Sequence, residues 1–534
     1  MQRPPKSVRS PRRPGPPLPF ATIVAVLAVI VLLAVGARAL FGGDDDPGPG
    51  LRRALGEGST EPAVSPTPDG DRGQGSDDEN VDAAGVRTAP PIGTEVTGLT
   101  TFRGNATRTY YGEGPLPSRP RVLWRYPPSG GLCSQSTNLG ETTTWCGTGW
   151  TGQPNVLVNR KGDTEVRIGA YDSAYHFIDG KTGEAVKPAF QTGDLAKGSA
   201  TSDPDGYPLY YAGSRDDEFR ILSTQKRKVE ELWSINAETS VPGGGLWNDD
   251  WDAAALVIDD YLLEGGENSY FYVIKLNRGY APNGDVTVDP RVVTAFPGYD
   301  DELLSSIPDD DVSIETSPSF HDGVVYFANS GGLVQGWDIS KILRGESDTA
   351  RRVFRFWTGD DTDGSIAIDD EGMLYVASEL QRFNATAARN GQLMKLDPSK
   401  RKPLVWSVPV TEQGSDGLGG IWATPAIYGD MVYVTTNYGE LLGVDKASGK
   451  VRWRIKLPAP LWSSPVPIDG VLLQGDCLGR LHAYDIASNP RREPKELWDV
   501  KLSGCIESTP AVWDGMIYVG TRSGGIYGIG DKRS

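Results

Sequence analysis

Beyond residue 95, most of the chain alternates short apolar runs with turns rich in Gly, Asp and Pro. The pattern is clearest in three successive copies at residues 424–453, 464–498 and 509–529. Each copy has a Pro followed by apolar residues, a turn of Asp and Gly, a second run, a Gly and a third run. Runs this short, bounded by turn residues, predict β-strands rather than helices.

The turn between the first two runs of a copy is the most informative local signal. Asp469-Gly470 and Asp514-Gly515 each stand between two apolar runs. A two-residue hairpin turn needs φ > 0 at both central positions, and Asp-Gly is a preferred pair there. In the first two copies a Trp, Trp453 or Trp498, marks a fourth strand. Four antiparallel strands per copy, repeated every 40 to 50 residues or so, predict the blades of a β-propeller.

Five more diverged copies precede these three, so we expect an all-β, eight-bladed propeller. They lie at residues 171–179, 208–233, 253–277, 317–357 and 366–406. The last copy reaches Ser534 without a fourth, Trp-bearing strand, whereas residues 122–126 read as such a strand without three others before it. We therefore expect the N-terminal strand to complete the last blade and close the ring, with the propeller spanning residues 96–534.

The first 95 residues have a different composition. Residues 1–19 carry five basic and no acidic side chains, and residues 20–37 carry no charge. Eighteen helical residues span roughly 27 Å, about the thickness of a bilayer core. We expect a cytoplasmic tail at 1–19, a transmembrane signal-anchor helix at 20–41, a flexible Gly, Pro and Asp linker at 42–95 and an extracytoplasmic propeller. The alternative is a cleaved signal peptide, because Ala37-Arg38-Ala39 offers a cleavage site.

Charge and cysteine usage narrow the class of partner. The formal net charge is −17, which argues against a nucleic-acid partner, since phosphate binding needs clustered Lys and Arg. Four cysteines in a translocated domain predict two disulfides rather than a metal or redox site. Cys133 and Cys146 lie in one loop, and Cys477 and Cys505 lie one repeat apart.

The candidate binding residues precede the first strand of successive blades, where the topology makes them converge on one mouth of the central channel. They are Trp150, Trp247, Asn248, Asp249, Asp250, Trp251, Glu315, Asp363, Trp422, Trp462 and Glu507. Aromatic faces interleaved with carboxylates suit saccharides, peptides or cationic groups. The alternative for the tryptophans is that they only wedge between blades.

Catalytic signatures are weak. The segment Gly147-x-Gly149-x-x-Gly152 matches a phosphate-loop pattern, but Gln153-Pro154 follows and no helix is predicted there. All three histidines have structural explanations, either as third-strand positions of the repeat or beside a hairpin turn. Residues 361–364, Asp-Thr-Asp-Gly, resemble part of a calcium loop but lack its distal Glu.

The repeat frame resembles that of the pyrroloquinoline-quinone-type propellers. The resemblance covers about residues 99–531 and includes Thr101-Phe102-Arg103-Gly104-Asn105 followed by Arg108-Thr109. This family includes quinoprotein dehydrogenases and an envelope propeller that assists outer-membrane protein assembly, and the chain is similar to its membrane-anchored bacterial members. The dehydrogenase branch implies a quinone stacked on Trp beside two adjacent bonded cysteines, with calcium on acidic side chains. The chain has no adjacent cysteines.

These patterns favour a monomeric, membrane-anchored binding or scaffolding module of the cell envelope over an enzyme. The expected ligand at the channel mouth is a protein, a peptide or a saccharide, and no cofactor is predicted. The alternative is a quinone- or metal-dependent oxidoreductase, which would need calcium or pyrroloquinoline quinone among the acidic residues of the mouth.

Overall fold

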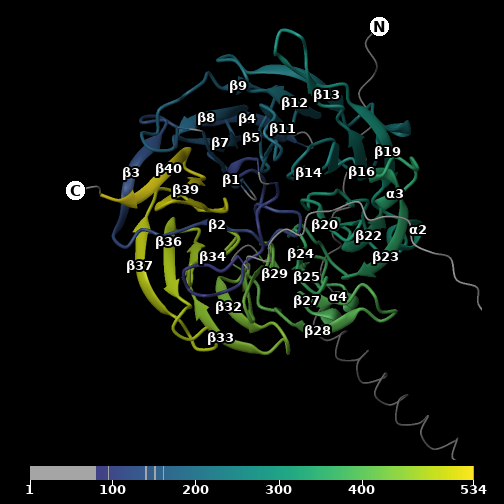
Figure 1. The fold of residues 1–534 in the computed structure, drawn as a ribbon. Helices are drawn as coiled ribbons and strands as arrows, with labels where there is room; N and C mark the ends of the chain where they lie inside the picture. The colour runs from purple at the N-terminus through teal and green to yellow at the C-terminus, as the bar shows by residue number, and fades with distance from the viewer. Residues whose placement is uncertain are drawn as a thin grey trace, which may run out of the picture. The chain divides into compact units, whose positions relative to one another are not determined.

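Eight sheets, the blades, stand side by side around a common axis (Figure 1). The computed structural model describes residues 80–93, 95–138, 141–149, 152–159, 161–414 and 417–532. One compact unit runs from Asp77 to Ser534, and the expected tail and anchor lie outside the described residues. Among the described residues, none forms a helix both long and apolar enough to span a bilayer. The expected eight-bladed, all-β propeller is confirmed.

Each blade begins with a strand near the axis and ends at the rim (Figure 1). Blade 1 contains β1 (Thr97–Leu99), β6 (Asn155–Val158), β7 (Thr164–Ala170), β8 (Ala174–Asp179) and β9 (Phe190–Gln191). Blade 2 contains β10 (Thr201–Ser202), β11 (Leu209–Gly213), β12 (Glu218–Ser223) and β13 (Glu230–Asn236). Blade 3 contains β14 (Leu256–Ile258), β15 (Tyr261–Gly265), β16 (Tyr270–Lys275) and β19 (Arg291–Pro297). Blade 4 contains β20 (Ser319–His321), β21 (Val324–Phe327), β22 (Leu333–Asp338) and β23 (Arg351–Trp357).

The second half of the ring repeats this arrangement. Blade 5 contains β24 (Ala367–Ile368), β25 (Leu374–Ala377), β27 (Leu393–Leu396) and β28 (Leu404–Val408). Blade 6 contains β30 (Ala426–Tyr428), β31 (Met431–Thr435), β32 (Glu440–Asp445) and β33 (Val451–Lys456). Blade 7 contains β34 (Val466–Ile468), β35 (Val471–Gly475), β36 (Arg480–Asp485) and β37 (Lys495–Lys501). Blade 8 contains β2 (Gly112–Glu113), β38 (Ala511–Trp513), β39 (Met516–Thr521), β40 (Gly525–Asp531) and β3 (Pro120–Tyr126).

Smaller elements lie in the connections between these strands. They are the hairpin of β4 (Cys133–Asn138) and β5 (Glu141–Cys146), the pairs β17 (Gly279–Tyr280) with β18 (Val286–Thr287) and β26 (Glu379–Leu380) with β29 (Gly419–Gly420), the 3₁₀ turn at Pro242–Gly244, and the short helices α2 (Asp301–Leu304), α3 (Ser340–Leu343) and α4 (Ala385–Asn390). The two expected disulfides are confirmed, Cys133–Cys146 across the β4–β5 hairpin and Cys477–Cys505 between blades 7 and 8.

Blade 8 closes the ring with strands from both parts of the chain. β3 pairs antiparallel with β40, placing Trp124 opposite Gly528, and β2 pairs in parallel with β38. The expectation that residues 122–126 complete the last blade is confirmed. The Trp124 indole is buried and donates to the carbonyl of Gly180 in blade 1, 2.9 Å away, so the same strand also ties blade 8 to blade 1.

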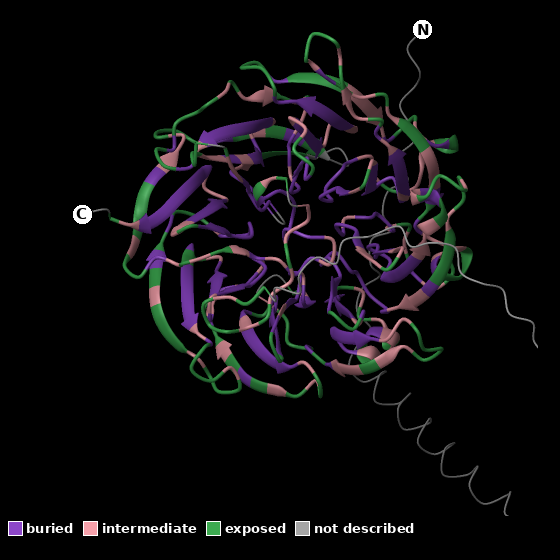
Figure 2. Ribbon diagram, viewed as in Figure 1, coloured by how far each residue is buried: buried purple, intermediate pink, exposed green. Residues whose placement is uncertain are grey.

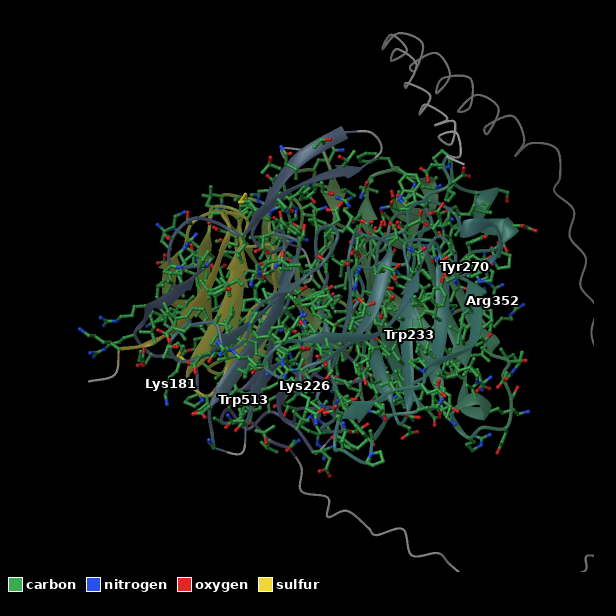
Figure 3. The ribbon with its side chains drawn as sticks, turned by 90° about the horizontal axis from the view of Figure 1, so that it is seen from above. Lys181, Lys226, Trp233, Tyr270, Arg352 and Trp513 are labelled. Atoms are coloured by element: carbon green, nitrogen blue, oxygen red, sulfur yellow. A yellow bond between two sulfur atoms is a disulfide. The ribbon has the colours of Figure 1, made fainter. Side chains whose placement is uncertain are left out.

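The apolar core lies in the seams between blades, whereas the outer strands and the connections carry most of the exposed residues (Figure 2). The fourth-strand tryptophans cross these seams. Trp453 donates to the carbonyl of Pro490 in the next blade at 2.9 Å, and Trp406 donates to Lys446 in the same way at 3.1 Å. Figure 3 shows the propeller edge-on, with its strands running between the two faces.

A segment between β1 and β2 fills the axis of the ring. Phe102, Arg103 and Arg108 have no exposed surface. The Arg108 guanidinium donates to the carbonyls of Pro318, at 2.6 and 2.9 Å, and of Ala254, at 3.1 Å, so it links blades 3 and 4. Burial lowers the pKa of Arg108 to about 9. The channel is therefore plugged between its two mouths.

The end of the expected linker lies against the propeller. The Asp82 carboxylate accepts a hydrogen bond from the Tyr428 hydroxyl, and Asp469 accepts one from the Ala83 amide at 3.1 Å. Residues 80–93 therefore form part of the folded unit, because their polar groups find partners on blades 6 and 7.

Candidate binding site at the channel mouth

The same position of seven successive blades contributes to one cavity. In these blades the first strand of the repeat is β10, β14, β20, β24, β30, β34 and β38. The residues that stand four positions before these strands are, in the same order, Lys197, Asp252, Glu315, Asp363, Trp422, Trp462 and Glu507. All seven line a cavity of about 480 Å³. We call them the mouth ring. The repeat geometry explains the convergence, because equivalent positions of radially arranged blades face the same axis.

Side chains from other connections complete the cavity wall. The guanidinium carbon of Arg522 lies 4.9 Å from the ring centroid of Trp145, on the disulfide-linked β4–β5 hairpin. It lies 4.7 Å from the ring centroid of Tyr171. Arg522 also forms an ion pair with Glu507 at 3.1 Å. Since Glu507 has this partner, the blade 8 side of the mouth is electrostatically balanced.

Five of the candidate residues from the sequence belong to the mouth ring: Glu315, Asp363, Trp422, Trp462 and Glu507. The two indoles meet edge to face, with centroids 5.4 Å apart and an interplanar angle of 83°. The Trp422 indole donates to the Asp363 carboxylate at 3.1 Å. Both tryptophans therefore present surface to the cavity, whatever they also contribute to packing between blades.

The candidates Trp247 to Trp251 do not line this cavity. Trp251 is 1% exposed and wedges between Phe219 of blade 2 and Tyr272 of blade 3, so it is a core residue. Trp247 is 49% exposed, whereas Asn248 and Asp249 are half-buried. Trp150 lies outside the described residues.

Sequence reasoning missed Asp252 and Lys197, which do line the cavity. The signal that could have found them is the register. Counting back four positions from Leu256 and Thr201, the first residues of β14 and β10, gives these two side chains. The neighbouring residues 247–251 give a stronger sequence pattern of aromatic and acidic side chains, but they are out of this register.

Blade 3 holds a set of three buried carboxylates that surround one ammonium group. Lys197 Nζ lies 3.2 Å from Asp250, 2.6 Å from Asp252 and 3.1 Å from Glu267. Arg215 adds a second contact to Asp250 at 2.8 Å. Burial alone would lower the pKa of Lys197, but the three carboxylates outweigh it and raise the pKa well above its usual range. We call Asp250, Asp252 and Glu267 the blade 3 set.

Blade 5 holds a second set at the equivalent positions: Asp361, Asp363 and Glu379. In each set three oxygen atoms, one per residue, lie within 4.8 Å of one another, a spacing that could hold a metal ion. Burial raises the pKa of each carboxyl of this blade 5 set well above its usual range, and carboxylate neighbours add to the shift. The structure thus brings Asp361 and Asp363, from the segment that resembles part of a calcium loop, together with Glu379, the first residue of β26.

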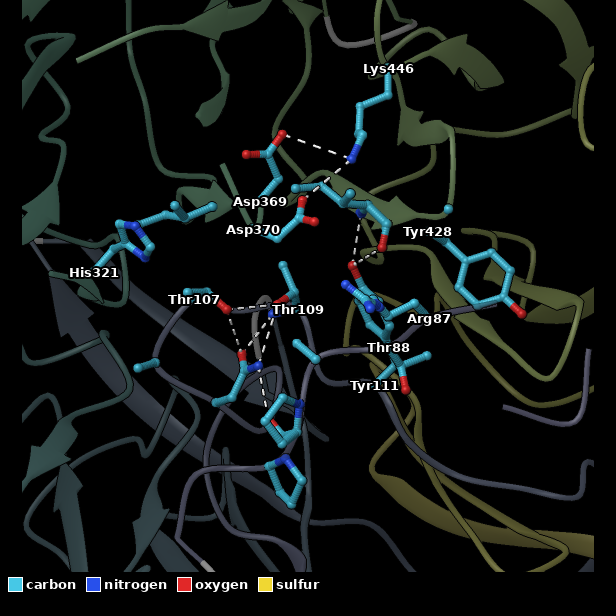
Figure 4. Close-up of a pocket in the computed structure, with 18 of the residues that line it drawn as sticks. Arg87, Thr88, Thr107, Thr109, Tyr111, His321, Asp369, Asp370, Tyr428 and Lys446 are labelled. Carbon is cyan, nitrogen blue, oxygen red and sulfur yellow. Dashed lines mark hydrogen bonds and ion pairs between the residues drawn. The ribbon is translucent and has the colours of Figure 1, made fainter. Parts of the chain in front are cut away.

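A second cavity, of about 630 Å³, opens at the opposite mouth (Figure 4). Residues 87–92 line it together with hairpin turns of blades 4 to 6 and residues of the axial segment. Lys446 lies 4.0 Å from Asp369 and 3.7 Å from Asp370, so opposite charges meet there. His321 also lines this cavity, away from the mouth ring. The described residues that line it do not indicate one class of ligand.

The other two histidines have partners on their own blades. His176 contacts Asp172 at 2.9 Å in blade 1. In blade 7, His482 lies 2.6 Å from Glu496 and 3.4 Å from Asp476. Burial lowers the pKa of His482, but these two carboxylates outweigh it, so the pKa lies above its usual value. Neither histidine lines the cavity of the mouth ring.

Part of the repeat region matches a known protein family. Residues 389–489 match a repeat family described as outer membrane protein assembly factor BamB. The repeats of this region are similar to those of pyrroloquinoline-quinone-type propellers. The matched region extends from the end of α4 in blade 5 to β36 of blade 7, where the sequence copies are clearest.

Among the similar proteins, the serine/threonine-protein kinase AfsK of Streptomyces griseus is 29% identical over 214 residues, 38% of this chain and 23% of the kinase. The assembly factor BamB of Burkholderia pseudomallei is 32% identical over 121 residues, 22% of this chain and 29% of that protein. The chain therefore matches less than a third of either relative. The quinohemoprotein alcohol dehydrogenase of Comamonas testosteroni aligns with a TM-score of 0.53 at 14% identity, covering 82% of this chain and 81% of the enzyme, and shares the fold.

The residues of the mouth do not fit a pyrroloquinoline quinone. This cofactor is a polyanionic carboxylate, yet five carboxyl side chains and only two basic ones, Lys197 and Arg522, line the cavity. Both basic groups already have carboxylate partners. The two disulfides join distant cysteines rather than adjacent ones. Trp422 and Trp462 meet edge to face, which turns one indole edge toward the other's face instead of leaving two parallel stacking surfaces.

Proposed function

We propose that the protein is a binding or scaffolding propeller of the cell envelope that engages a protein partner through its mouth ring. The observation that carries the proposal is the convergence of four carboxyl residues and two tryptophans of equivalent register on one cavity. Aromatic surface beside carboxylates suits the peptide and cationic groups that proteins present. The match of residues 389–489 to the repeat of an assembly factor supports a protein as the partner.

Capture from cells that express the protein would test this function. Tagged full-length protein would be cross-linked in cells, purified and compared with the double variant Trp422→Ala/Trp462→Ala. We expect the variant to lose the partner. The matched control is Trp247→Ala, because Trp247 is half exposed but lies outside the cavity, and it should retain the partner. Equal capture by all three proteins would refute a role for the mouth ring.

The proposal includes a location. We infer that residues 20–41 anchor the protein and that the propeller lies outside the cytoplasm, since the apolar run follows a basic tail. Two disulfides support the location, because such bonds persist in oxidising compartments. Protease treatment of intact spheroplasts should remove a C-terminal tag. A tag that is protected until the membrane is broken would contradict this location.

A further inference from the structure

The blade 3 and blade 5 sets occupy identical positions of their blades. Asp250 and Asp252 stand six and four residues before Leu256, and Asp361 and Asp363 stand six and four residues before Ala367. Glu267 and Glu379 each follow the last residue of the second strand, Gly265 or Ala377, by two positions. The repeat therefore builds the same three-carboxylate arrangement twice around one mouth.

The blade 3 set shows which group this arrangement accepts. Its occupant is a lysine ammonium, held at 2.6 to 3.2 Å by all three carboxylates. Lys197 comes from the mouth ring position of the preceding blade, blade 2. Its side chain is 17% exposed, and those of the three carboxylates are 3 to 5% exposed, so the ammonium compensates charges that water barely reaches.

The blade 5 set lacks such an occupant. The mouth ring position of its preceding blade, blade 4, is Glu315, a fourth carboxyl group, whereas blade 2 supplies Lys197 to the blade 3 set. Among the described residues, no ion pair joins a Lys, Arg or His nitrogen to Asp361, Asp363 or Glu379. The nearby Arg382 guanidinium is paired with Asp309 and acts on Asp361 only from beyond ion-pair distance. Burial of charged carboxylates without compensation is strongly unfavourable, which is why the pKa of each of these groups is raised toward the neutral form. A cation from outside the chain would stabilise their charged forms, as Lys197 does in the blade 3 set.

Two unsatisfied atoms also point to a ligand. Oδ1 of Asp361 and Oε1 of Glu379 have no hydrogen-bond partner, and these residues are only 6% and 2% exposed. The blade 3 set has one such atom, Oδ1 of Asp252, even with its ammonium in place. Glu379 lines the cavity of the mouth ring, so its side chain can be reached from solvent through that opening. Buried polar atoms without partners are rare in native proteins and commonly mark a bound group.

The walls beside the blade 5 set distinguish between kinds of cation. Trp422 and Trp462 follow Asp363 in the mouth ring, and the Trp422 indole N–H donates a hydrogen bond to the Asp363 carboxylate. Indole faces attract ammonium groups and cover the methylene stem that carries them. A divalent metal ion prefers a shell of oxygen ligands and gains little from an aromatic wall. The surroundings thus favour an organic ammonium over a metal ion.

We propose that the blade 5 set binds the ammonium group of a lysine side chain supplied by the protein partner, entering the mouth as Lys197 enters the blade 3 set. The inference rests on the proposed function and names the recognised group. Three carboxylates accept the three ammonium hydrogens, and the tryptophans cover the side-chain stem. The partner would thereby complete the repeat arrangement that Glu315 leaves open.

Isothermal titration of full-length protein with acetyl-Gly-Lys-Gly-amide tests the proposal. We expect the peptide to bind. In Asp361→Asn/Glu379→Gln the dissociation constant should rise at least about tenfold, because two of the three carboxylates that would surround the ammonium are replaced by neutral amides. The matched control Asp250→Asn alters the set that Lys197 already fills and should stay within about twofold. Acetylation of the peptide lysine should abolish binding, because it removes the charge.

Further titrations distinguish a partner lysine from a free amine and from a metal ion. Propane-1,3-diamine that binds more tightly than the peptide would assign the site to free amines and overturn the partner lysine. Calcium chloride that binds stoichiometrically, and is lost in the same double variant, would replace the ammonium by a metal ion. Glu315→Lys provides an independent test if the double variant Asp361→Asn/Glu379→Gln does not fold. It should supply an internal ammonium, weaken peptide binding at least about tenfold and raise the Tm. Unchanged binding and Tm in this variant would contradict the proposal.

The two proposals can fail separately. If cellular capture depends on Trp422 and Trp462 but no lysine peptide binds, the partner-binding function stands and the ammonium site falls. If capture is independent of the mouth ring while the peptide binds, the site stands without the proposed function.

Discussion

Lys197→Met should destabilise the propeller more than any single exposed-charge substitution. The methionine keeps the length and apolar stem of the side chain but removes the ammonium from Asp250, Asp252 and Glu267. Removing one member of a buried charge network leaves its partners unpaired and costs about 3 to 5 kcal/mol. Contacts at 2.6 to 3.2 Å with carboxylates at most 5% exposed place this network in the buried class.

Urea unfolding of full-length protein at neutral pH measures this free energy. The matched control is Lys226→Met, since Lys226 is 51% exposed and pairs with Glu230 at 3.5 Å and with Asp285 at 3.3 Å. Exposed ion pairs contribute little to stability, so the control should unfold almost like the wild type. A loss below about 1 kcal/mol for Lys197→Met would show that the blade 3 set does not depend on its ammonium, and the comparison with blade 5 would lose its basis.

Three further predictions test other parts of the fold. Trp124→Ala should cost about 3 to 5 kcal/mol in urea unfolding, since it empties the seam that closes the ring, whereas Trp247→Ala should cost little; equal losses would contradict the closure. Cys477→Ser/Cys505→Ser should cost about 3 to 4 kcal/mol, the chain entropy of a loop of this length, and an unchanged unfolding midpoint would refute it. The raised pKa of His482 stabilises the fold fully below about pH 6.5 and is lost as pH rises through the folded-state value. The stability gap between wild type and His482→Gln should therefore shrink between pH 6 and 9 or so, and a gap that widens would contradict the sign.

The fold was predictable because its turns and strands obey local rules. Asp469 and Gly470 have φ of 47° and 75°, and Asp514 and Gly515 have φ of 43° and 79°, the conformations that the two-residue hairpin turn requires. The closing strand was predictable because a blade without a fourth strand leaves an open edge, which Trp124's segment fills. These features depend on neighbours in sequence or on one missing partner.

The site was only partly predictable, because its residues are defined by register and by packing. Trp251 reads as a binding aromatic, yet it is core, since the seam between blades 2 and 3 needs a large side chain there. Lys197 sits in a sequence of small residues and shows its meaning only once Asp250, Asp252 and Glu267 surround it. The arginines of the axial segment were recognised as part of the frame, but their carbonyl partners come from blades far along the chain.

Photocross-linking from inside the mouth tests the central claim most directly. A photoreactive residue would replace Leu418, a neutral residue that lines the cavity, and in a second protein Val405, which is 52% exposed on the outer strand β28. In cells, we predict a discrete partner adduct from position 418 that disappears in the Asp361→Asn/Glu379→Gln background, and none from position 405. The same adducts from both positions, or an adduct at 418 that persists in that background, would contradict recognition at the mouth ring.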